Sequence, residues 1–259
     1  ISYQRFFRRY RFLAGMTGTA REVANELWTV YRLPVVTVPP NQPLARRAGP
    51  AHIFPGEEHK WQAVTGRIFQ IHQQGRPVLV GTRSVAASES LSARLQQAGM
   101  PHRVLNARQD KQEAEIIAQA GRPGRITIAT NMAGRGTDIS LAAGVAERGG
   151  LHVIATEPHD ARRVDRQLFG RCGRQGDPGS CELYGSLEDE LFWPYRDRRW
   201  FPWLRRWMNP HTPWGRWLGM RVCRLAQRSA ERKHYRLRRD LLKYDETLDR
   251  SMAFSGRRE

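Results

Sequence analysis

Two short segments of the sequence carry residue types and spacings that suit phosphate chemistry. The first, residues 127–139, passes from β-branched residues into a turn with Gly134 and Gly136 and ends near the carboxylate of Asp138. Glycines let a backbone approach a ligand closely, and a carboxylate just past such a turn can accept hydrogen bonds from a ribose. Taken alone, the pattern fits a tight strand-to-helix turn with Asp138 as N-cap better than it fits a ligand site.

The second segment, residues 167–177, places Arg171 and Arg174 three residues apart, each after a glycine. The planar arginine fork suits phosphoryl oxygens, and an arginine supplied across a cleft stabilises the transition state of phosphoryl transfer. The structural alternative is a pair of surface arginines near a helix end, where cations suit the helix dipole. Together, the two segments predict one half of a nucleotide site.

The phosphate cradle that would complete such a site is not found in this sequence. No GxxxxGK[ST] loop occurs in the 259 residues, so we expect the cradle on a neighbouring lobe of a longer polypeptide. We therefore predict that the chain by itself does not turn over a nucleotide.

Composition narrows the possible classes of protein. With 40% hydrophobic and 26% charged residues the chain is typical of a globular protein, and its apolar runs fall far short of the roughly 20 residues of a membrane span. The net charge of +18 indicates attraction to polyanions such as nucleic acid, anionic lipid or acidic protein. Three scattered cysteines, and histidines without ligand-type spacing, predict no disulfide framework and no structural metal.

Short β-branched runs alternate with segments of helical period, which predicts an α/β fold with a parallel sheet covered by helices on both faces. The predicted strands are residues 35–38, 77–81, 102–105, 125–130, 151–156 and 181–185. The prolines between residues 39 and 50 predict a linker. Both candidate segments follow strands, so we expect them at the carboxyl edge of the sheet, where ligands of such folds bind.

Several strings of residues resemble the bacterial SecA preprotein translocase ATPases, in the same order as in that family. The strings are Gly15 to Ala20, Val78 to Thr82, Val104 to Ala107, Thr127 to Ile139, Gly149 to Ile154, Arg162 to Leu168 and Arg238 to Glu246. The resemblance implies a RecA-like second motor domain of superfamily 2, followed by a helical extension. It also implies ATP and Mg²⁺ in the intact protein, with the magnesium ligands and catalytic carboxylate on the absent first domain.

The family pattern assigns roles to three groups of positions. One motif relays the nucleotide state between the motor domains, one lines the nucleotide, and one carries the arginines that reach the γ-phosphate. The coupling motif is Thr17, Gly18 and Thr19, the cofactor-binding residues are Gly136, Asp138 and Gln167, and the catalytic arginines are Arg171 and Arg174. The sequence departs from the pattern at Phe169, Cys172 and Pro158, where the family usually has arginine, serine and arginine.

The resemblance and shifts in composition predict four parts of the chain. Residues 1–38 would be the tail of the first nucleotide-binding domain and a connector, and residues 39–192 the second RecA-like motor domain. Residues 193–220 would be a Trp/Arg-rich insert, and residues 221–259 a helical scaffold-like extension.

The Trp/Arg-rich insert has no counterpart in the family that we can align. Residues 193–217 hold six of the eight tryptophans, together with six arginines and four prolines. Tryptophan rings and arginine charges suit the surface of an anionic membrane. A tryptophan-packed cap over the helical extension explains the same residues equally well, and binding of single-stranded nucleic acid is a third interpretation.

The sequence therefore predicts part of a SecA-like, ATP-driven motor for protein translocation. The expected partners are unfolded preprotein, the membrane translocation channel, anionic phospholipids and the missing first nucleotide-binding domain, with nucleic acid less favoured. The expected location is cytoplasmic, peripheral on the inner membrane. Two alternatives stay open: the C-terminal domain of a superfamily-2 RNA or DNA helicase, and a binding module without catalysis, against which the retained Asp138 and arginine pair argue.

Overall fold

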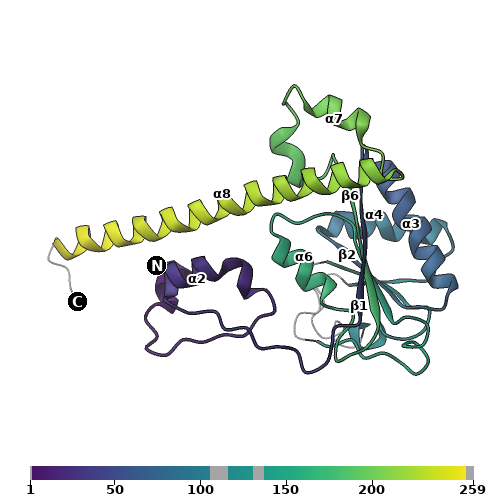
Figure 1. Ribbon diagram of the computed structural model, residues 1–259, viewed down its shortest axis with the longest axis horizontal. Coiled ribbons are helices and arrows are strands. Elements are labelled where there is room, and N and C mark those ends of the chain that lie inside the picture. Colours follow the sequence, from purple (N-terminus) through teal and green to yellow (C-terminus); the bar gives the residue numbers. More distant parts are fainter. Residues whose placement is uncertain (1, 106–115, 131–136, 255–259) are drawn as a thin grey trace. The chain divides into compact units, whose positions relative to one another are not determined.

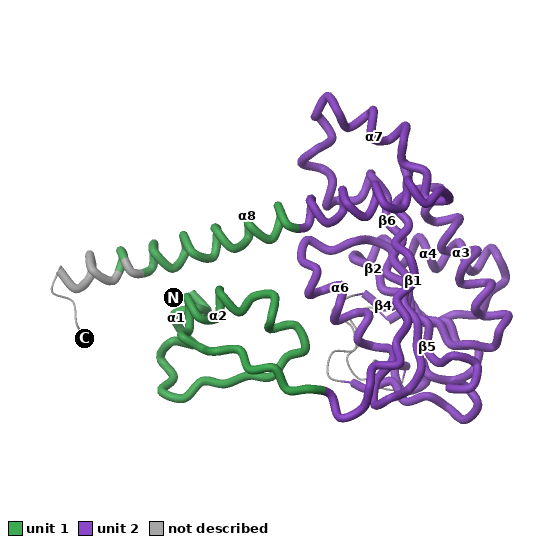
Figure 2. The backbone as a smooth tube through the Cα atoms, viewed as in Figure 1, with its two compact units in different colours: residues 1–39, 228–259 green, residues 40–227 purple. Residues whose placement is uncertain are grey.

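The computed structural model describes residues 2–105, 116–130 and 137–254. They belong to two compact units, one made of residues 40–227 and the other of residues 1–39 together with residues 228–259 (Figure 2). Each unit is described by itself below. The four domains expected from the sequence stay a prediction, because compact units of this chain and domains of a longer protein are different divisions.

The larger unit is built on a six-stranded sheet in which every strand runs parallel to its neighbours (Figure 1). The strands are β1 (Arg46–Phe54), β2 (Val78–Thr82), β3 (Arg103–Leu105), β4 (Ile126–Thr130), β5 (Leu151–Ala155) and β6 (Gly179–Ser186). Their order is β1-β6-β5-β2-β4-β3. Parallel neighbours need crossover connections, which helices provide here. The predicted fold class, a RecA-like parallel sheet with flanking helices and a C-terminal helix, is confirmed.

Helices cover both faces of this sheet. The relevant helices are α3 (Glu57–Gln73), α4 (Val85–Gln97) and α6 (Arg162–Phe169). Because side chains alternate along a strand, Val78 and Val80 of β2 pack with α3 and α4, whereas Leu79 lies in a second cluster against which Leu168 of α6 packs. The two clusters are the core that holds the candidate site in place.

One strand prediction is wrong and one strand was not predicted. Residues 35–38 form no strand, and β1 lies in the proline-containing segment interpreted as a linker. β1 is an edge strand paired only with β6, and its pairing shifts register between Ala48 and Ala51, around Pro50. An edge position with a bulge tolerates proline, because no ladder hydrogen bond is lost there.

After β6 the chain passes through a 3₁₀ helix (Glu190–Tyr195) and α7 (Phe201–Trp207) into the long helix α8 (Pro213–Phe254). Thr212 caps α8, since its Oγ1 accepts a hydrogen bond from the Gly215 N–H at 3.1 Å, and Pro213 takes the first helical position. The helix predicted after Arg221 therefore begins eight residues earlier. Among the described residues, none of the helices combines the length and hydropathy that a membrane crossing requires.

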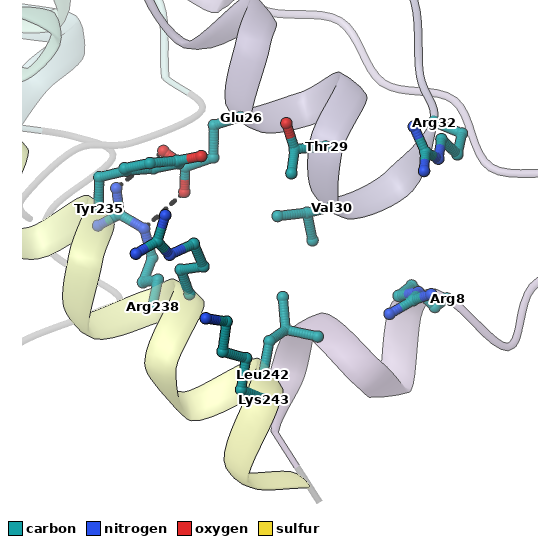
Figure 3. A pocket seen from close by; sticks show the side chains of 10 residues that line it. Arg8, Glu26, Thr29, Val30, Arg32, Tyr235, Arg238, Leu242 and Lys243 are labelled. Atoms are coloured by element: carbon teal, nitrogen blue, oxygen red, sulfur yellow. Dashed lines mark hydrogen bonds and ion pairs between the residues drawn. The ribbon is translucent and has the colours of Figure 1, made fainter. Parts of the chain in front are cut away.

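The smaller unit contains α1 (Tyr3–Phe7), a 3₁₀ helix (Ala20–Val23), α2 (Ala24–Tyr31) and the part of α8 from residue 228 onward. The guanidinium of Arg238 on α8 donates to both carboxylate oxygens of Glu26 on α2, at 2.6 and 2.9 Å. Figure 3 shows this pair beside a cavity of about 240 Å³, which basic side chains dominate. The ion pair ties the N-terminal helices to α8 within the unit.

Candidate nucleotide-contact site

The arginine turn lies at the amino edge of the sheet, not at the carboxyl edge that the sequence led us to expect. Helix α6 begins after β5 at the carboxyl edge and runs back along the sheet to the start of β1. Arg46, the first residue of β1, donates from Nη1 to the carbonyl oxygens of Phe169 at 2.9 Å and Cys172 at 3.4 Å. Helix α6 begins at the predicted edge, but its eight residues carry the arginines across the sheet to the other edge.

The turn depends on its glycines. Gly173 has a φ of +65°, and a Cβ added there would lie 2.6 Å from the Cβ of Arg46. Gly176 also has a positive φ, of +86°. Only glycine combines this backbone geometry with so close an approach of β1, so Gly173 is a structural requirement of the turn.

Arg174 reaches the first candidate segment directly. Its Nη1 donates to Oδ1 of Asp138 at 2.6 Å, and its Nε donates to the carbonyl oxygen of Gly170 at 2.8 Å. The side chains of Arg174 and Asp138 are 39% and 45% exposed, so the pair is held at the surface and not sealed in the core. Its guanidinium is therefore fixed in direction and still open to a ligand.

Arg171 also contacts the first candidate segment: its Nη1 donates to the carbonyl oxygen of Thr137 at 3.1 Å. The structure thus brings three of the predicted site residues together: Asp138, Arg171 and Arg174. Gln167 lies exposed on α6, four residues before Arg171. The prediction for Gly136 lies outside the described residues.

A cavity of about 460 Å³ opens beside Arg174. Its lining comes from the arginine turn and from the chain leading into β1, and includes Gln42, Arg46, Gly173 and Arg174. This volume lies in the range of about 300–1,000 Å³ that is usual for ligand sites. Backbone groups and guanidinium donors around one cavity form a donor set that fits phosphoryl oxygens.

The donor set supports the phosphate role of the arginines more directly than the ribose role of Asp138. Oδ1 of Asp138 accepts from Arg174 and also from the backbone N–H of Ile139 at 3.0 Å. A ribose hydroxyl would share or replace these hydrogen bonds. In this arrangement Asp138 acts first as the residue that orients Arg174.

A buried polar cluster anchors the other end of α6, and the sequence reasoning missed it. Asp165 on α6 accepts from the His159 N–H at 3.1 Å and from Nε2 of Gln227 at 2.7 Å. The same Nε2 donates to the carbonyl oxygen of His159 at 2.8 Å. Gln227 belongs to α8, so this cluster joins the helix that carries the arginines to α8. A lone glutamine 62 residues beyond its partner gives no local sequence signal.

The coupling motif is compact in its own unit. The hydroxyls of Thr17 and Thr19 lie 3.2 Å apart, and the backbone N–H of Thr19 donates to Oγ1 of Thr17 at 3.3 Å. Thr19 is buried, and a Cβ added at Gly18 would meet nothing within 4 Å. The motif is a turn held by hydrogen bonds between Thr17 and Thr19, with free space next to Gly18.

The departure at Cys172 is accommodated by packing. Cys172 is buried, and its Sγ donates weakly to the carbonyl oxygens of Phe169 at 3.3 Å and Ser180 at 3.4 Å. Interaction with the Cys181 sulfur, followed by burial, raises the pKa of the Cys172 thiol. The thiol therefore replaces a hydroxyl as a buried donor. Among the described residues, no cluster of three or more His, Cys, Asp or Glu could hold a metal ion.

The fold is an α/β domain with a RecA-like parallel sheet, in which Asp138, Arg171 and Arg174 lie together. Comparison with known sequences gives the family. The model described as "SecA P-loop domain" matches residues 43–145 and 142–208, and the one described as "SecA DEAD-like domain" matches residues 1–28. The chain belongs to the SecA family.

Two relatives named as SecA agree with this assignment. The chain is 54% identical over its whole length to "Protein translocase subunit SecA 3" of Magnetococcus marinus and 50% identical to "Protein translocase subunit SecA 2" of Nitrosospira multiformis. It covers 40% and 39% of these two proteins, so it spans less than half the length of the relatives. A solved structure of the yeast DEAD-box splicing factor Prp28 matches with a TM-score of 0.47 and 16% identity, over 70% of this chain and 38% of that one.

Proposed function

We propose that this chain supplies the arginine half of the ATP site in a SecA-like protein-translocating motor. The observation that carries the proposal is the connection of the two candidate segments: Arg174 to Asp138 at 2.6 Å and Arg171 to the Thr137 carbonyl at 3.1 Å, beside a cavity of about 460 Å³. Arg171 and Arg174 are the catalytic pair, and Gly136, Asp138 and Gln167 contact the nucleotide.

The roles of the side chains follow from their charge and geometry. ATP with Mg²⁺ supplies the phosphoryl group, and both are held mainly by the first nucleotide-binding domain of the longer protein, which carries the metal ligands. Arg174, oriented by Asp138, presents donors to the γ-phosphate, where negative charge is concentrated. Arg171 presents the second set of guanidinium donors, and its contact with the Thr137 carbonyl keeps it next to the segment that contains Asp138. Thr17, Gly18 and Thr19 relay nucleotide state between the domains.

The partners follow from the family. The longer protein moves unfolded preprotein through a membrane translocation channel, and it works at the cytoplasmic face of the membrane with anionic phospholipids as part of its surroundings. The buried contact of Gln227 with Asp165 supports coupling of the site to α8, since it fixes α8 to the helix that bears the arginines.

The test is steady-state ATP hydrolysis by the longer protein with Arg174→Ala and Arg171→Ala. We expect a loss of kcat of about a thousandfold or more for Arg174→Ala, because a transition-state arginine is removed. Arg163→Ala, an exposed arginine of α6, is the matched control and should retain activity. An Arg174→Ala protein that folds and hydrolyses ATP at the parental rate contradicts the proposal, as does robust hydrolysis by the 259-residue chain alone.

The ligand that stimulates ATP hydrolysis distinguishes a protein-translocating motor from a helicase. Unfolded preprotein should raise the ATPase rate of the longer protein. Stimulation by RNA alone, with salt-sensitive RNA binding, would instead assign the motor to nucleic acid.

A further inference from the structure

Six tryptophans of the Trp/Arg-rich insert are exposed to solvent. Their exposed fractions run from 47% for Trp200 to 61% for Trp203 and Trp214. The six are Trp193, Trp200, Trp203, Trp207, Trp214 and Trp217. A cap packed by tryptophans would bury these rings, so that interpretation of the sequence is wrong.

Helix α7 has two apolar stripes, and the fold uses only one of them. Phe201, Leu204 and Met208, spaced by three and four residues, are buried with exposed fractions of 9%, 4% and 2%. Trp200, Trp203 and Trp207 have the same spacing, lie one residue earlier, and are exposed. The tryptophan stripe therefore stays open to solvent, and the contact of the Trp200 ring with Tyr195, at 6.0 Å, is local in sequence.

The start of α8 continues this pattern. The rings of Trp214 and Trp217 stack with centroids 5.0 Å apart, and the Arg221 guanidinium lies 5.3 Å from the Trp217 ring centroid. α7 and α8 are consecutive and in contact, because a Cβ added at Gly219 of α8 would lie 3.6 Å from the Met208 sulfur. The elements that carry these rings, the 3₁₀ helix, α7 and the start of α8, follow one another in the chain and belong to one compact unit (Figure 2).

The charge around the rings is positive and mostly unneutralised. Residues 193–217 contain six arginines and one acidic residue, Asp197. Arg205 pairs with Glu188 at 2.9 Å. Arg198, Arg199 and Arg206 are exposed and have no carboxylate partner within the described chain. We call the six tryptophans and these three arginines the Trp/Arg surface.

We propose that the Trp/Arg surface docks on the anionic headgroup layer of a membrane. Indole rings favour the water–hydrocarbon boundary, and each arginine near an anionic bilayer adds an attraction of about 1 kcal/mol. The inference deepens the peripheral location proposed above, and it is independent of the ATP site.

Bilayer lipid fits these residues better than single-stranded nucleic acid. Base stacking needs ring faces that are free, whereas Trp214 is stacked on Trp217, and Trp203 lies 5.9 Å from Trp207. Among the six tryptophans of this surface, Trp193 alone donates its indole N–H to an acceptor in the described part of the chain, the Glu188 carbonyl at 3.1 Å. The other indoles are left to hydrogen-bond to headgroups and water.

The test is flotation of the full chain with vesicles, together with its tryptophan emission. We expect binding to vesicles that contain phosphatidylglycerol, with a blue shift of the emission, and little binding to pure phosphatidylcholine. Trp203→Ala/Trp214→Ala should reduce the shift and weaken binding at least tenfold. Arg198→Gln/Arg199→Gln should weaken it about 30-fold, the equivalent of two arginine contacts.

Matched controls separate the surface from general effects. Trp28→Ala removes an equally exposed tryptophan of the other unit, and Arg103→Gln/Arg122→Gln removes two exposed arginines elsewhere. Both should bind like the parent. Equal losses in the control and test variants, equal binding to both lipids, no vesicle binding, or binding to single-stranded RNA alone would each overturn the proposal.

Discussion

Asp138 holds Arg174: their side chains, 36 residues apart in sequence, form an ion pair of 2.6 Å at a surface cavity. Because both groups are more than a third exposed, the pair contributes little to folding, at most about 1 kcal/mol. Its effect lies in directing the guanidinium toward the place where a phosphate would bind. The carboxylate is thus a positioning group for the proposed catalytic arginine.

Asp138→Asn in the longer protein tests this relationship. We expect kcat for ATP to fall roughly ten- to a hundredfold, because Arg174 loses its orientation, while KM changes little. The urea midpoint should stay close to that of the parent. If the contact of Asp138 with the nucleotide matters more than its orientation of Arg174, KM rises and kcat holds, so the two constants distinguish the two effects.

Gly173→Ala should destabilise the larger unit through the arginine turn. Alanine at position 173 would have a positive φ, and its methyl group would lie 2.6 Å from the Cβ of Arg46. Gly99 has a similar φ of +66°, but a methyl group added there would meet nothing within 4 Å. Gly99→Ala is therefore the matched control and should cost only the backbone penalty of about 1 kcal/mol. Urea unfolding should show a clearly larger loss for Gly173→Ala, and equal losses would show that contact with β1 is unimportant.

Strands with strong β-branched runs could be predicted from the sequence, and the contacts that position the site could not. Runs such as Val78–Thr82 are buried on both faces, so composition alone marks them. β1 begins with Arg46 and contains Pro50, so its composition does not resemble that of a buried strand. An edge strand with a bulge tolerates such residues, because one of its sides has no neighbouring strand. No local pattern in the sequence indicates that Arg46 contacts the arginine turn.

Residue types in the sequence suggested which side chains form the candidate site. The expected position of the arginine turn on the sheet was wrong. The spacing of Arg171 and Arg174 pointed to two side chains that the structure places beside Thr137 and Asp138, but α6 carries the turn back to the amino edge of the sheet. The rule that ligands bind at the carboxyl ends of parallel strands does not apply to residues at the end of the helix that follows a strand. Long-range pairs such as Asp165 with Gln227 depend on the whole fold.

Lys60 and Asp189 form a buried ion pair that stabilises the larger unit. Nζ of Lys60 lies 2.7 Å from Oδ1 of Asp189, with side chains 0% and 3% exposed. Lys60→Met should lower the free energy of unfolding by about 3–5 kcal/mol, because a buried carboxylate loses its partner. The double variant Lys60→Met/Asp189→Asn should recover much of this loss, since no charge stays buried.

The exposed pair of Arg94 and Glu58 provides the control for this prediction. The two side chains are 32% and 59% exposed, so Arg94→Met should cost less than about 1 kcal/mol. Burial raises the pKa of Asp189 to about 7. Removal of Lys60 should therefore cost less at about pH 5 than at about pH 8, because a protonated Asp189 needs no cation. A pH-independent loss would show that Lys60 acts by packing alone.

His152 should make the larger unit less stable in mild acid. Its side chain is 1% exposed, its Nδ1 lies 2.7 Å from the Ser180 hydroxyl, and its Nε2 makes no hydrogen bond within the described residues. Burial lowers the pKa of His152 from 6.5 to about 4, with Arg76 and Arg67 acting in the same direction and Glu182 opposing them. The folded state keeps the ring neutral at a pH where the unfolded chain binds a proton.

The sign of the pH effect follows from these two pKa values. Between about pH 6.5 and about pH 4 the unfolded state binds more protons than the folded state, so stability falls as pH falls. The loss contributed by His152 reaches up to about 3 kcal/mol at the acid end of this window. His152→Asn keeps a polar atom near Ser180 without titrating, so its urea midpoint should depend less on pH than that of the parent. His59→Asn, at an exposed histidine, should leave the parental slope unchanged, and an identical slope for His152→Asn would show that the buried ring does not couple folding to protons.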